Sequence, residues 1–433
     1  MGQTVAQKIV ARAAGRDTVE AGDYVTVSPD YTCCQELAWQ TRKRMMQEIG
    51  VDRVARPDKV IMVVDHTTSA AMGSSYHVNH REMKDFAFRH GVDNFFGAGS
   101  GLRHLVLTEK GFARPGLLVF SDEPNIASIG VVGALNIAVS SEVVATQIAD
   151  ENWMMVPKSA RITLDGRLPF GTLLRDLAQI LIRDYARTDT LSQSCIEFVG
   201  PAIAGLSLDE RQSLLACAYH TGADTALMPV DAPALAYARE RAQRRPFHLL
   251  ESDTDAVYVH EAAYDLAAVS PMVTVPPELH GAVPVEDVAG LAIHQAALGS
   301  CANNRLDDLR AAAAILRGRR VDRAVTMYIT PGSRAVYAQA ATEGLLAVFM
   351  EAGATVLAPG CTTCWGYEGV LSDGEVQIST HQMNYHGRNG SRSARSYLAS
   401  PYVVAASAVA GRIADPRPLL AEPARAWQPR EPR

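Results

Sequence analysis

The sequence lacks the marks of fibrous, membrane-spanning and nucleic-acid-binding proteins. Aromatic residues make up only 6% of the 433 residues, and no apolar run reaches the ~18 residues that cross a bilayer. Positive charge is not in excess, because the formal net charge is −6. The N-terminal stretch also has no signal-peptide core. We therefore expect a soluble protein of the cytoplasm that binds neither nucleic acid nor membrane.

Cysteine is scarce and odd in number, which argues against a disulfide framework. Two of the seven cysteines, Cys33 and Cys34, are adjacent. For this adjacent pair we expect one buried and one exposed thiol. Reduced thiols or metal ligands explain the seven cysteines better than disulfide bonds do.

The sequence contains enough apolar residues for a large core: 48% of the chain is hydrophobic. Buried strands predicted at 58–64 and 116–122 deliver Asp65, His66 and Asp122 at their ends, as in open α/β sheets. We predict three α/β domains, at 1–158, 159–270 and 271–433. The Pro-rich stretch 269–287 suits a linker, and the tail 417–433 is expected to be poorly ordered.

From about residue 285 the pattern is strongly β-α-β. Predicted strands end shortly before Cys301 and before the pair Cys361 and Cys364, and single helices are expected over 305–319 and 336–353. Because the carboxyl ends of parallel strands meet at one edge of a sheet, the three thiols are expected to converge there.

Several kinds of chemistry compete for these three thiols. A structural zinc site usually has four ligands, and a thioredoxin-like motif would stand at a helix start without a third cysteine. A [4Fe–4S] cluster with three thiolates would leave one iron open to a ligand. Asn303 and Asn304 would cap the helix that follows. The remaining alternative is that the three are buried structural thiols.

The motifs around the thiols resemble those of the aconitase superfamily, specifically the large subunits of 3-isopropylmalate dehydratase and homoaconitase. LGSCANNRLDDLRAAAAILRGR is similar to IGSCTNxRxxDLRxAAxxLKGR, and EAGATVLAPGCTTCWG to EAGxxxxxPGCxxCxG. The resemblance extends to VVDHTTSA, GLRHLVLTEKGFARPG and IEFVGPAIAGLSLDER, and so covers nearly the whole chain. It implies an aconitase-like three-domain α/β/α architecture around a central cleft.

The resemblance also implies an activity: the dehydration or rehydration of a small hydroxy-carboxylate by a hydro-lyase. The cluster iron would hold the substrate hydroxyl while neighbouring groups move protons. By position in the motifs, the resemblance implies the following roles: cluster ligands Cys301, Cys361 and Cys364; acid–base residues Asp65, His66, His104 and Asp122; and substrate-binding residues Arg388, Asn303, Arg334 and Gln382.

One part of the family site is missing from this sequence. The single-chain relatives carry a swivel domain that supplies a serine base, and this sequence ends without one. The resemblance therefore implies a separate small swivel subunit, in a heterodimer or heterotetramer.

The sequence departs from the family pattern at the active site. Ser121-Asp122-Glu123-Pro124-Asn125 stands where the family has GDSHT, His220 replaces a glutamate, and Gln382 and Met383 replace an asparagine and an arginine. Glu123 and His220 are therefore candidates for a new acid–base pair, and the substrate is not fixed. The alternatives are a divergent hydro-lyase with a [2Fe–2S] or mononuclear metal centre, and an aconitase-like binding protein without catalysis.

Overall fold

The computed structural model describes residues 2–69 and 73–420. Most of the tail predicted to be poorly ordered, 421–433, lies outside the described residues. The chain forms two compact units: the first is Met1–Thr67, Ala71–Asp165 and Thr188–Tyr264, and the second is Thr68–Ala70, Gly166–Arg187 and Asp265–Arg433. Neither unit is one continuous stretch of sequence.

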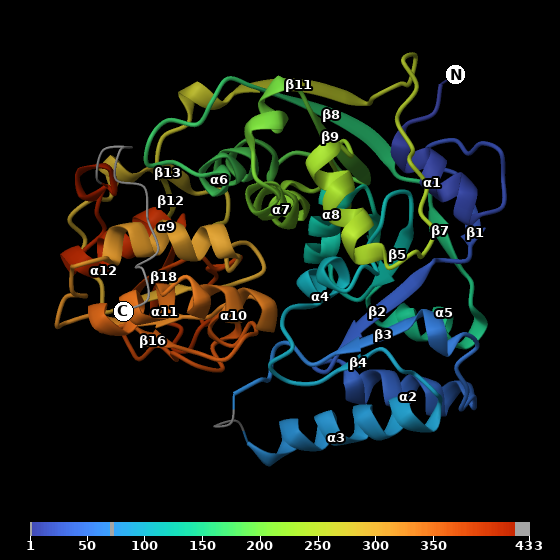
Figure 1. Ribbon diagram of the computed structural model, residues 1–433, viewed down its shortest axis with the longest axis horizontal. Coiled ribbons are helices and arrows are strands. Elements are labelled where there is room, and N and C mark those ends of the chain that lie inside the picture. The colour runs from blue at the N-terminus through green and yellow to red at the C-terminus, as the bar shows by residue number, and fades with distance from the viewer. Residues whose placement is uncertain (1, 70–72, 421–433) are drawn as a thin grey trace. The chain divides into compact units, whose positions relative to one another are not determined.

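A five-stranded parallel sheet forms one part of the first unit (Figure 1). Its strands, in spatial order, are β4 (Phe95–Phe96), β3 (Val60–Val63), β2 (Tyr31–Gln35), β5 (Leu118–Ser121) and β6 (Leu135–Ala138). The accompanying helices are α1 (Val5–Ala13), α2 (Trp39–Ile49), α3 (Ser74–Arg89), α4 (Arg103–Glu109) and α5 (Val143–Ala149), with 3-10 turns η1 (Pro57–Lys59), η2 (Pro124–Val132) and η3 (Ser140–Glu142). Two further strands, β1 (Tyr24–Val27) and β7 (Asn152–Met155), pair antiparallel.

A four-stranded sheet completes the first unit. Its order is β10 (Thr225–Leu227), β9 (Ser194–Val199), β8 (Lys158–Asp165) and β11 (His260–Asp265). Its helices are α7 (Leu208–Cys217) and α8 (Ala232–Ala242), with η4 (Pro201–Gly205) and η5 (Ala218–Thr221). Ser207 caps α7 by accepting a hydrogen bond from the Glu210 amide.

The second unit is built on a seven-stranded sheet. Its order is β13 (Ala282–Pro284), β12 (Met272–Thr274), β18 (Arg395–Ala399), β17 (Val376–Ser379), β14 (Gln295–Leu298), β15 (Thr326–Ile329) and β16 (Thr355–Val356). The run from β18 to β16 is parallel. The helices are α6 (Leu174–Tyr185), α9 (Leu306–Leu316), α10 (Arg334–Thr342), α11 (Leu345–Ala352) and α12 (Pro401–Ala410), with η6 (Leu266–Ala268), η7 (Val285–Asp287), η8 (Thr363–Trp365) and η9 (Arg417–Leu419).

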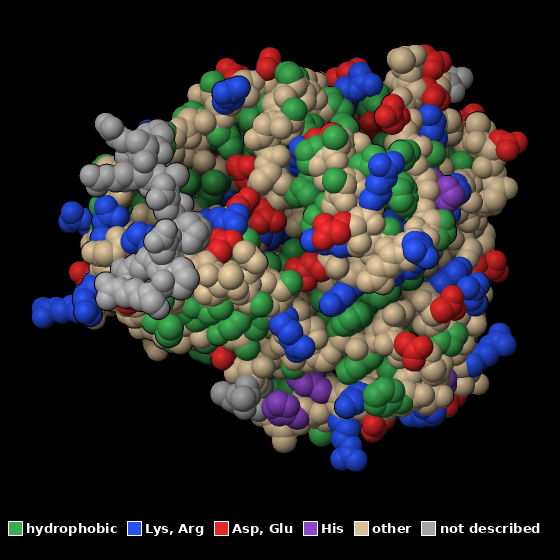
Figure 2. Space-filling model, viewed as in Figure 1, with side chains coloured by type: hydrophobic (Ala, Val, Ile, Leu, Met, Phe, Trp, Pro, Cys, Tyr) green, Lys and Arg blue, Asp and Glu red, His purple; other side chains and the backbone are tan. Residues whose placement is uncertain are grey.

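The α/β class predicted from the sequence is confirmed. Each predicted domain, 1–158, 159–270 and 271–433, contains most or all of one of the three larger sheets, while the boundaries themselves stay a prediction. Among the described residues, no helix has the length and apolarity needed to span a membrane. On the face that Figure 2 shows, acidic and basic side chains are interspersed.

Three local expectations were wrong. The stretch 269–287 is not a linker, because β12 and β13 lie in it and join the seven-stranded sheet. The single helix expected over 336–353 is two helices, because Gly344 adopts φ 72° between α10 and α11. Cys33 and Cys34 are both buried, since β2 is a central strand with neighbours on both sides.

Candidate active site

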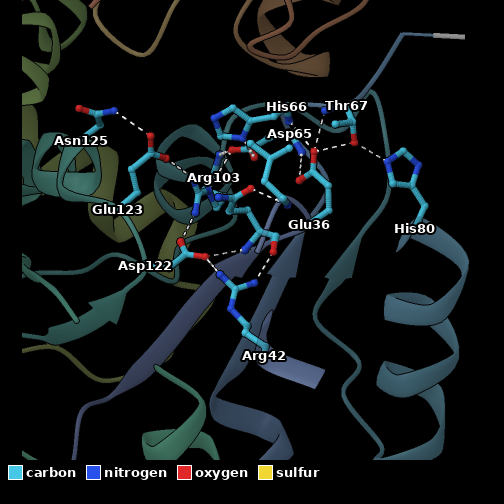
Figure 3. A network of polar contacts seen from close by, with 12 residues as sticks. Glu36, Arg42, Asp65, His66, Thr67, His80, Arg103, Asp122, Glu123 and Asn125 are labelled. Carbon is cyan, nitrogen blue, oxygen red and sulfur yellow. Dashed lines mark hydrogen bonds and ion pairs between the residues drawn. The ribbon is translucent and has the colours of Figure 1, made fainter. Parts of the chain in front are cut away.

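The first group of candidate residues lies where three adjacent parallel strands end. Glu36 follows β2, Asp65 follows β3 after one residue, and Asp122 follows β5. Because β3, β2 and β5 are neighbours in the sheet, their carboxyl ends bring these three side chains to one edge. We call the seven residues joined there the carboxylate network: Glu36, Arg42, Asp65, His66, Arg103, Asp122 and Glu123 (Figure 3).

Arg103, the first residue of α4, holds the network together. Its Nε donates to Oδ2 of Asp65 at 3.0 Å, and its two Nη atoms donate to Asp122 and Glu123. Arg42 of α2 donates to Asp122 from a second side. Since a guanidinium presents its donors in a rigid planar fork, it can bind three carboxylates at once.

His66 is oriented by the residue before it. Its Nδ1 lies 2.8 Å from Oδ1 of Asp65, and both side chains are buried. Burial alone would lower the pKa of His66, but the charges of Asp65, Glu123 and Glu36 outweigh burial and raise this pKa to about 9. Burial opposes ionisation of Asp65 too, yet Arg103 and His66 hold the pKa of Asp65 well below its usual range.

Glu36 fixes the backbone that carries His66. Its carboxylate accepts hydrogen bonds from the amides of Asp65 (3.1 Å), His66 (2.8 Å) and Thr67 (2.6 Å) and from the Thr67 hydroxyl (2.9 Å). Glu36, Asp65 and His66 place one possible metal-ligand atom each within 4.8 Å of one another. Protein donors already bind the carboxylates of Glu36 and Asp65. We therefore interpret the three residues as a hydrogen-bonded support and not as a metal site.

The two other histidine candidates lie on separate elements. His104 follows Arg103 in α4 and is buried. His220 lies in η5, also buried, with its ring 4.1 Å from that of Tyr219. Although η5 packs against η2, the element that follows Glu123, the pairing of Glu123 with His220 stays a prediction.

The second group of candidates lies in the second unit, past the ends of β14 and β16. Cys301, Cys361 and Cys364 are all buried thiols. Cys361 lies within hydrogen-bonding reach of the other two, and these neighbours, together with burial, raise its pKa. The hydrogen bond from Cys361 and the positive charge of Arg388 lower the pKa of Cys364. We call these three residues the thiol site.

Arg388 supports the loop of Cys364. Its Nε donates to the Cys364 carbonyl at 2.9 Å, one Nη lies 3.7 Å from the Cys364 sulfur, and its guanidinium stacks 3.9 Å over the ring of Trp365. Gln382 lies beside the same sulfur, because its backbone amide donates to it. A guanidinium has five N–H donors, so two remain in Arg388 for a substrate carboxylate.

The two other predicted substrate-binding residues of this unit, Asn303 and Arg334, differ in burial. Asn303 is buried and donates to Asp308 of α9 at 2.8 Å, but neither it nor Asn304 is the N-cap, because Arg305 occupies that position. Arg334 is exposed at the start of α10. The roles predicted for Asn303 and Arg334 therefore stay predictions.

The surroundings of the thiol site, as well as its three cysteine residues, suit an iron–sulfur cluster. The side-chain amides of Asn304 and Asn384 are buried without a hydrogen-bond partner among the described residues, which is costly unless a ligand satisfies them. Amide and guanidinium donors around sulfur ligands are the usual support of such clusters.

Four functional arginine and glutamate residues were not identified from the sequence: Glu36, Arg42, Arg103 and Arg305. Arg305 is buried and donates to the carbonyls of Cys301 and Ala302, which fixes the loop of Cys301. Of these four residues, only Glu36 has a local sequence feature that could have identified it, because it directly follows a strand. Arg103 stands next to the candidate His104, but nothing local marks it as the partner of Asp65, 38 residues away.

Comparisons with known proteins agree with the family that the sequence motifs indicate. The model of the aconitase family (aconitate hydratase) matches residues 7–291 and 284–411. The chain is 35% identical over 424 residues to 3-isopropylmalate dehydratase large subunit 1 of Methanopyrus kandleri, covering 97% of this chain and 100% of the relative. It is 36% identical over 421 residues to the probable 3-isopropylmalate dehydratase large subunit of Methanothermobacter thermautotrophicus, with 97% and 100% covered. The large subunit of Heliobacterium modesticaldum is 35% identical over 420 residues, with 96% and 99% covered.

These matches run from end to end and exceed 30% identity, so the family predicted from the motifs is confirmed. Membership implies an iron–sulfur cluster in general terms, and these relatives are named as large subunits. The chain belongs to the aconitase family.

Proposed function

We propose that this chain is the large, cluster-bearing subunit of a hydro-lyase that dehydrates or rehydrates a small hydroxy-carboxylate. The observation that carries the proposal is the convergence of three buried thiols past β14 and β16, in a chain that matches 3-isopropylmalate dehydratase large subunits end to end. A small swivel subunit, in a heterodimer or heterotetramer, completes the site.

Cys301, Cys361 and Cys364 would hold a [4Fe–4S] cluster. When bound, such a cluster supplies an iron that acts as a Lewis acid on a hydroxyl oxygen. A single tetrahedral ion would need its sulfur ligands ~3.8 Å apart. Because Cys361 lies within hydrogen-bonding reach of both other thiols, the family match and not the thiol spacing favours a cluster over such an ion.

The chain's own side chains would divide the remaining work. Asp65 holds Nδ1 of His66, so delivery of a proton to the departing hydroxyl falls to Nε2 of a histidine that stays protonated at neutral pH. Asp122 and Arg103 keep Asp65 in place. Arg388, with Arg334 and Gln382, would bind a substrate carboxylate, and a residue of the small subunit would take the carbon-bound proton.

The test is anaerobic co-purification with the small subunit, followed by metal analysis and a screen of hydroxy acids for absorbance of an unsaturated product. About four iron and four sulfide per chain, with turnover of at least one acid, would agree with the proposal. Cys361→Ala should lose iron, whereas Cys217→Ala, at a buried thiol of the other unit, should keep it. About two of each, or one metal ion, would favour the divergent centre; a full cluster without turnover would favour a binding protein.

A further inference from the structure

Glu123 differs from the rest of the carboxylate network in its exposure. The side chains of Asp65, Arg103 and Asp122 are 1–3% exposed, whereas that of Glu123 is 23% exposed. Figure 3 shows Glu123 and Asn125 at one end of the network. Glu123 is therefore the carboxylate of this network that an incoming molecule meets.

The carboxylate of Glu123 is fixed in place. One oxygen accepts from Nδ2 of Asn125 at 3.0 Å and the other from Arg103, while the Glu123 carbonyl accepts from the Ser121 hydroxyl at 2.9 Å. Each carboxylate oxygen has two acceptor sites. One site on each oxygen thus remains for a donor from outside the network.

The cations of the network are committed to its own carboxylates. Arg103 uses Nε and both Nη atoms on Asp65, Asp122 and Glu123, Arg42 uses one Nη on Asp122, and His66 bonds Asp65 through Nδ1. With His66 protonated, three cations face four carboxylates. Arg103 has two further N–H donors, but its side chain is only 1% exposed, so a substrate carboxylate brought to Glu123 would meet a like charge without an accessible guanidinium.

We propose that Glu123 determines specificity: the substrate presents a hydroxyl or an ammonium group, and not a carboxylate, to this end of the network. The inference rests on the proposed hydro-lyase function and narrows its substrate class to hydroxy acids whose carboxylate is bound away from Glu123. A hydroxyl or ammonium group donates to the remaining acceptor sites of Glu123, whereas a carboxylate has no proton to donate.

The experiment uses the complex with its cluster and small subunit. Hydroxy acids are supplied as matched sets that differ at one position: carboxylate, carboxamide, hydroxymethyl or aminomethyl. Turnover is measured as kcat/KM. Binding of the same compounds is measured by calorimetry, so that the preference among them is measured even if none of them turns over. We expect the hydroxymethyl or aminomethyl compound to be preferred over the carboxylate by at least about ten-fold.

Two variants and one control make the result specific to Glu123. Glu123→Gln and Glu123→Ser should each reduce the preference by about ten-fold, because the repelling charge is gone. Two substitutions guard against one that misfolds, and the unfolding midpoint of each is measured. Glu151→Gln, which removes an exposed carboxylate of the same unit, should keep the preference.

Equal or better use of the carboxylate by the unmodified complex, or a preference that both Glu123 variants retain, would overturn the inference. Failure of every acid to turn over would instead count against the hydro-lyase function. The binding ratio would still decide the role of Glu123 in that case.

Discussion

At the residue scale, the candidate site depends on buried charges that neutralise one another. Arg103 and Arg42 are both buried, and each binds carboxylates that are themselves buried. Such pairs add little net stability over an apolar alternative, but removing one member leaves a charge uncompensated. The network therefore fixes the positions of His66 and Glu123, but it tolerates substitution of its buried charged residues poorly.

Arg103→Met should destabilise the first unit severely. Asp65 and Asp122 would lose a buried cation, and breaking such a pair costs about 3–5 kcal/mol. The measurement is the free energy of unfolding in urea. Arg44→Met, which breaks an exposed pair with Glu48, is the control and should barely change it. An unchanged midpoint for Arg103→Met would show that the network does not hold this unit together.

His66 should make stability depend on pH. Its pKa is about 9 in the folded chain against an ordinary value of 6.5, so the stabilisation is fully present below about pH 6.5 and is lost as pH rises through about 9. The expected loss is about 3 kcal/mol. Urea unfolding between pH 6 and pH 10 measures it. His66→Gln should flatten this dependence, whereas His77→Gln, at an exposed residue of α3, should leave it in place. A flat profile for the unmodified chain would contradict the prediction.

At the scale of elements, a close approach of backbones positions the loop of Cys301. Gly299 follows β14 with φ 136°, and a Cβ there would lie 2.5 Å from the Thr330 carbonyl oxygen after β15. Its amide donates to Thr380 Oγ1 at 3.0 Å, and its carbonyl accepts from Thr363 at 3.5 Å, beside the cysteine pair. Gly299 thus links the ends of β14, β15 and β17 to the turn that carries Cys301.

Gly299→Ala should weaken retention of the cluster. The added Cβ must displace the Thr330 carbonyl or the turn, and a side chain at φ 136° adds strain of about 1–3 kcal/mol. Iron and sulfide content, and the rate at which visible absorbance is lost in air, measure the effect. Gly318→Ala is the matched control, because Gly318 also has positive φ but open space around it. Equal iron retention in both variants would mean that Gly299 is not needed to position Cys301.

The sequence predicted elements well where the signal is local and poorly where it is not. Apolar strands followed by Asp65, Asp122 and Cys301 lie where the pattern placed them, since periodicity and turn residues act over a few positions. The strands β12 and β13 pair with each other locally, but they were missed because β12 joins the sheet through β18, more than 100 residues away. Arg103 and Arg42 were missed for the same reason: only tertiary structure brings a buried arginine to its carboxylates.

At the scale of the whole molecule, the second unit depends on a segment that is distant in the sequence. Helix α6, Leu174–Tyr185, packs against β12 and β13. Gln179 donates to Thr274 Oγ1 at 2.7 Å and to the Leu398 carbonyl at 2.8 Å, and Asp176 accepts from the Met272 amide at 2.9 Å. The sheet that carries the thiol site is thus completed by a helix from outside the predicted domain 271–433.

A fragment of residues 271–433 should therefore not fold by itself. Without α6, the apolar face of β12 and the Thr274 and Leu398 groups lose their partners, and buried polar groups left unpaired cost about 1–3 kcal/mol each. The same fragment joined by a flexible linker to residues 166–187 should give cooperative unfolding and a near-ultraviolet circular dichroism spectrum. The linked fragment with Asp176→Ala and Gln179→Ala should unfold at lower urea. Cooperative unfolding of the bare fragment would contradict this dependence and would favour 271–433 as an independent domain.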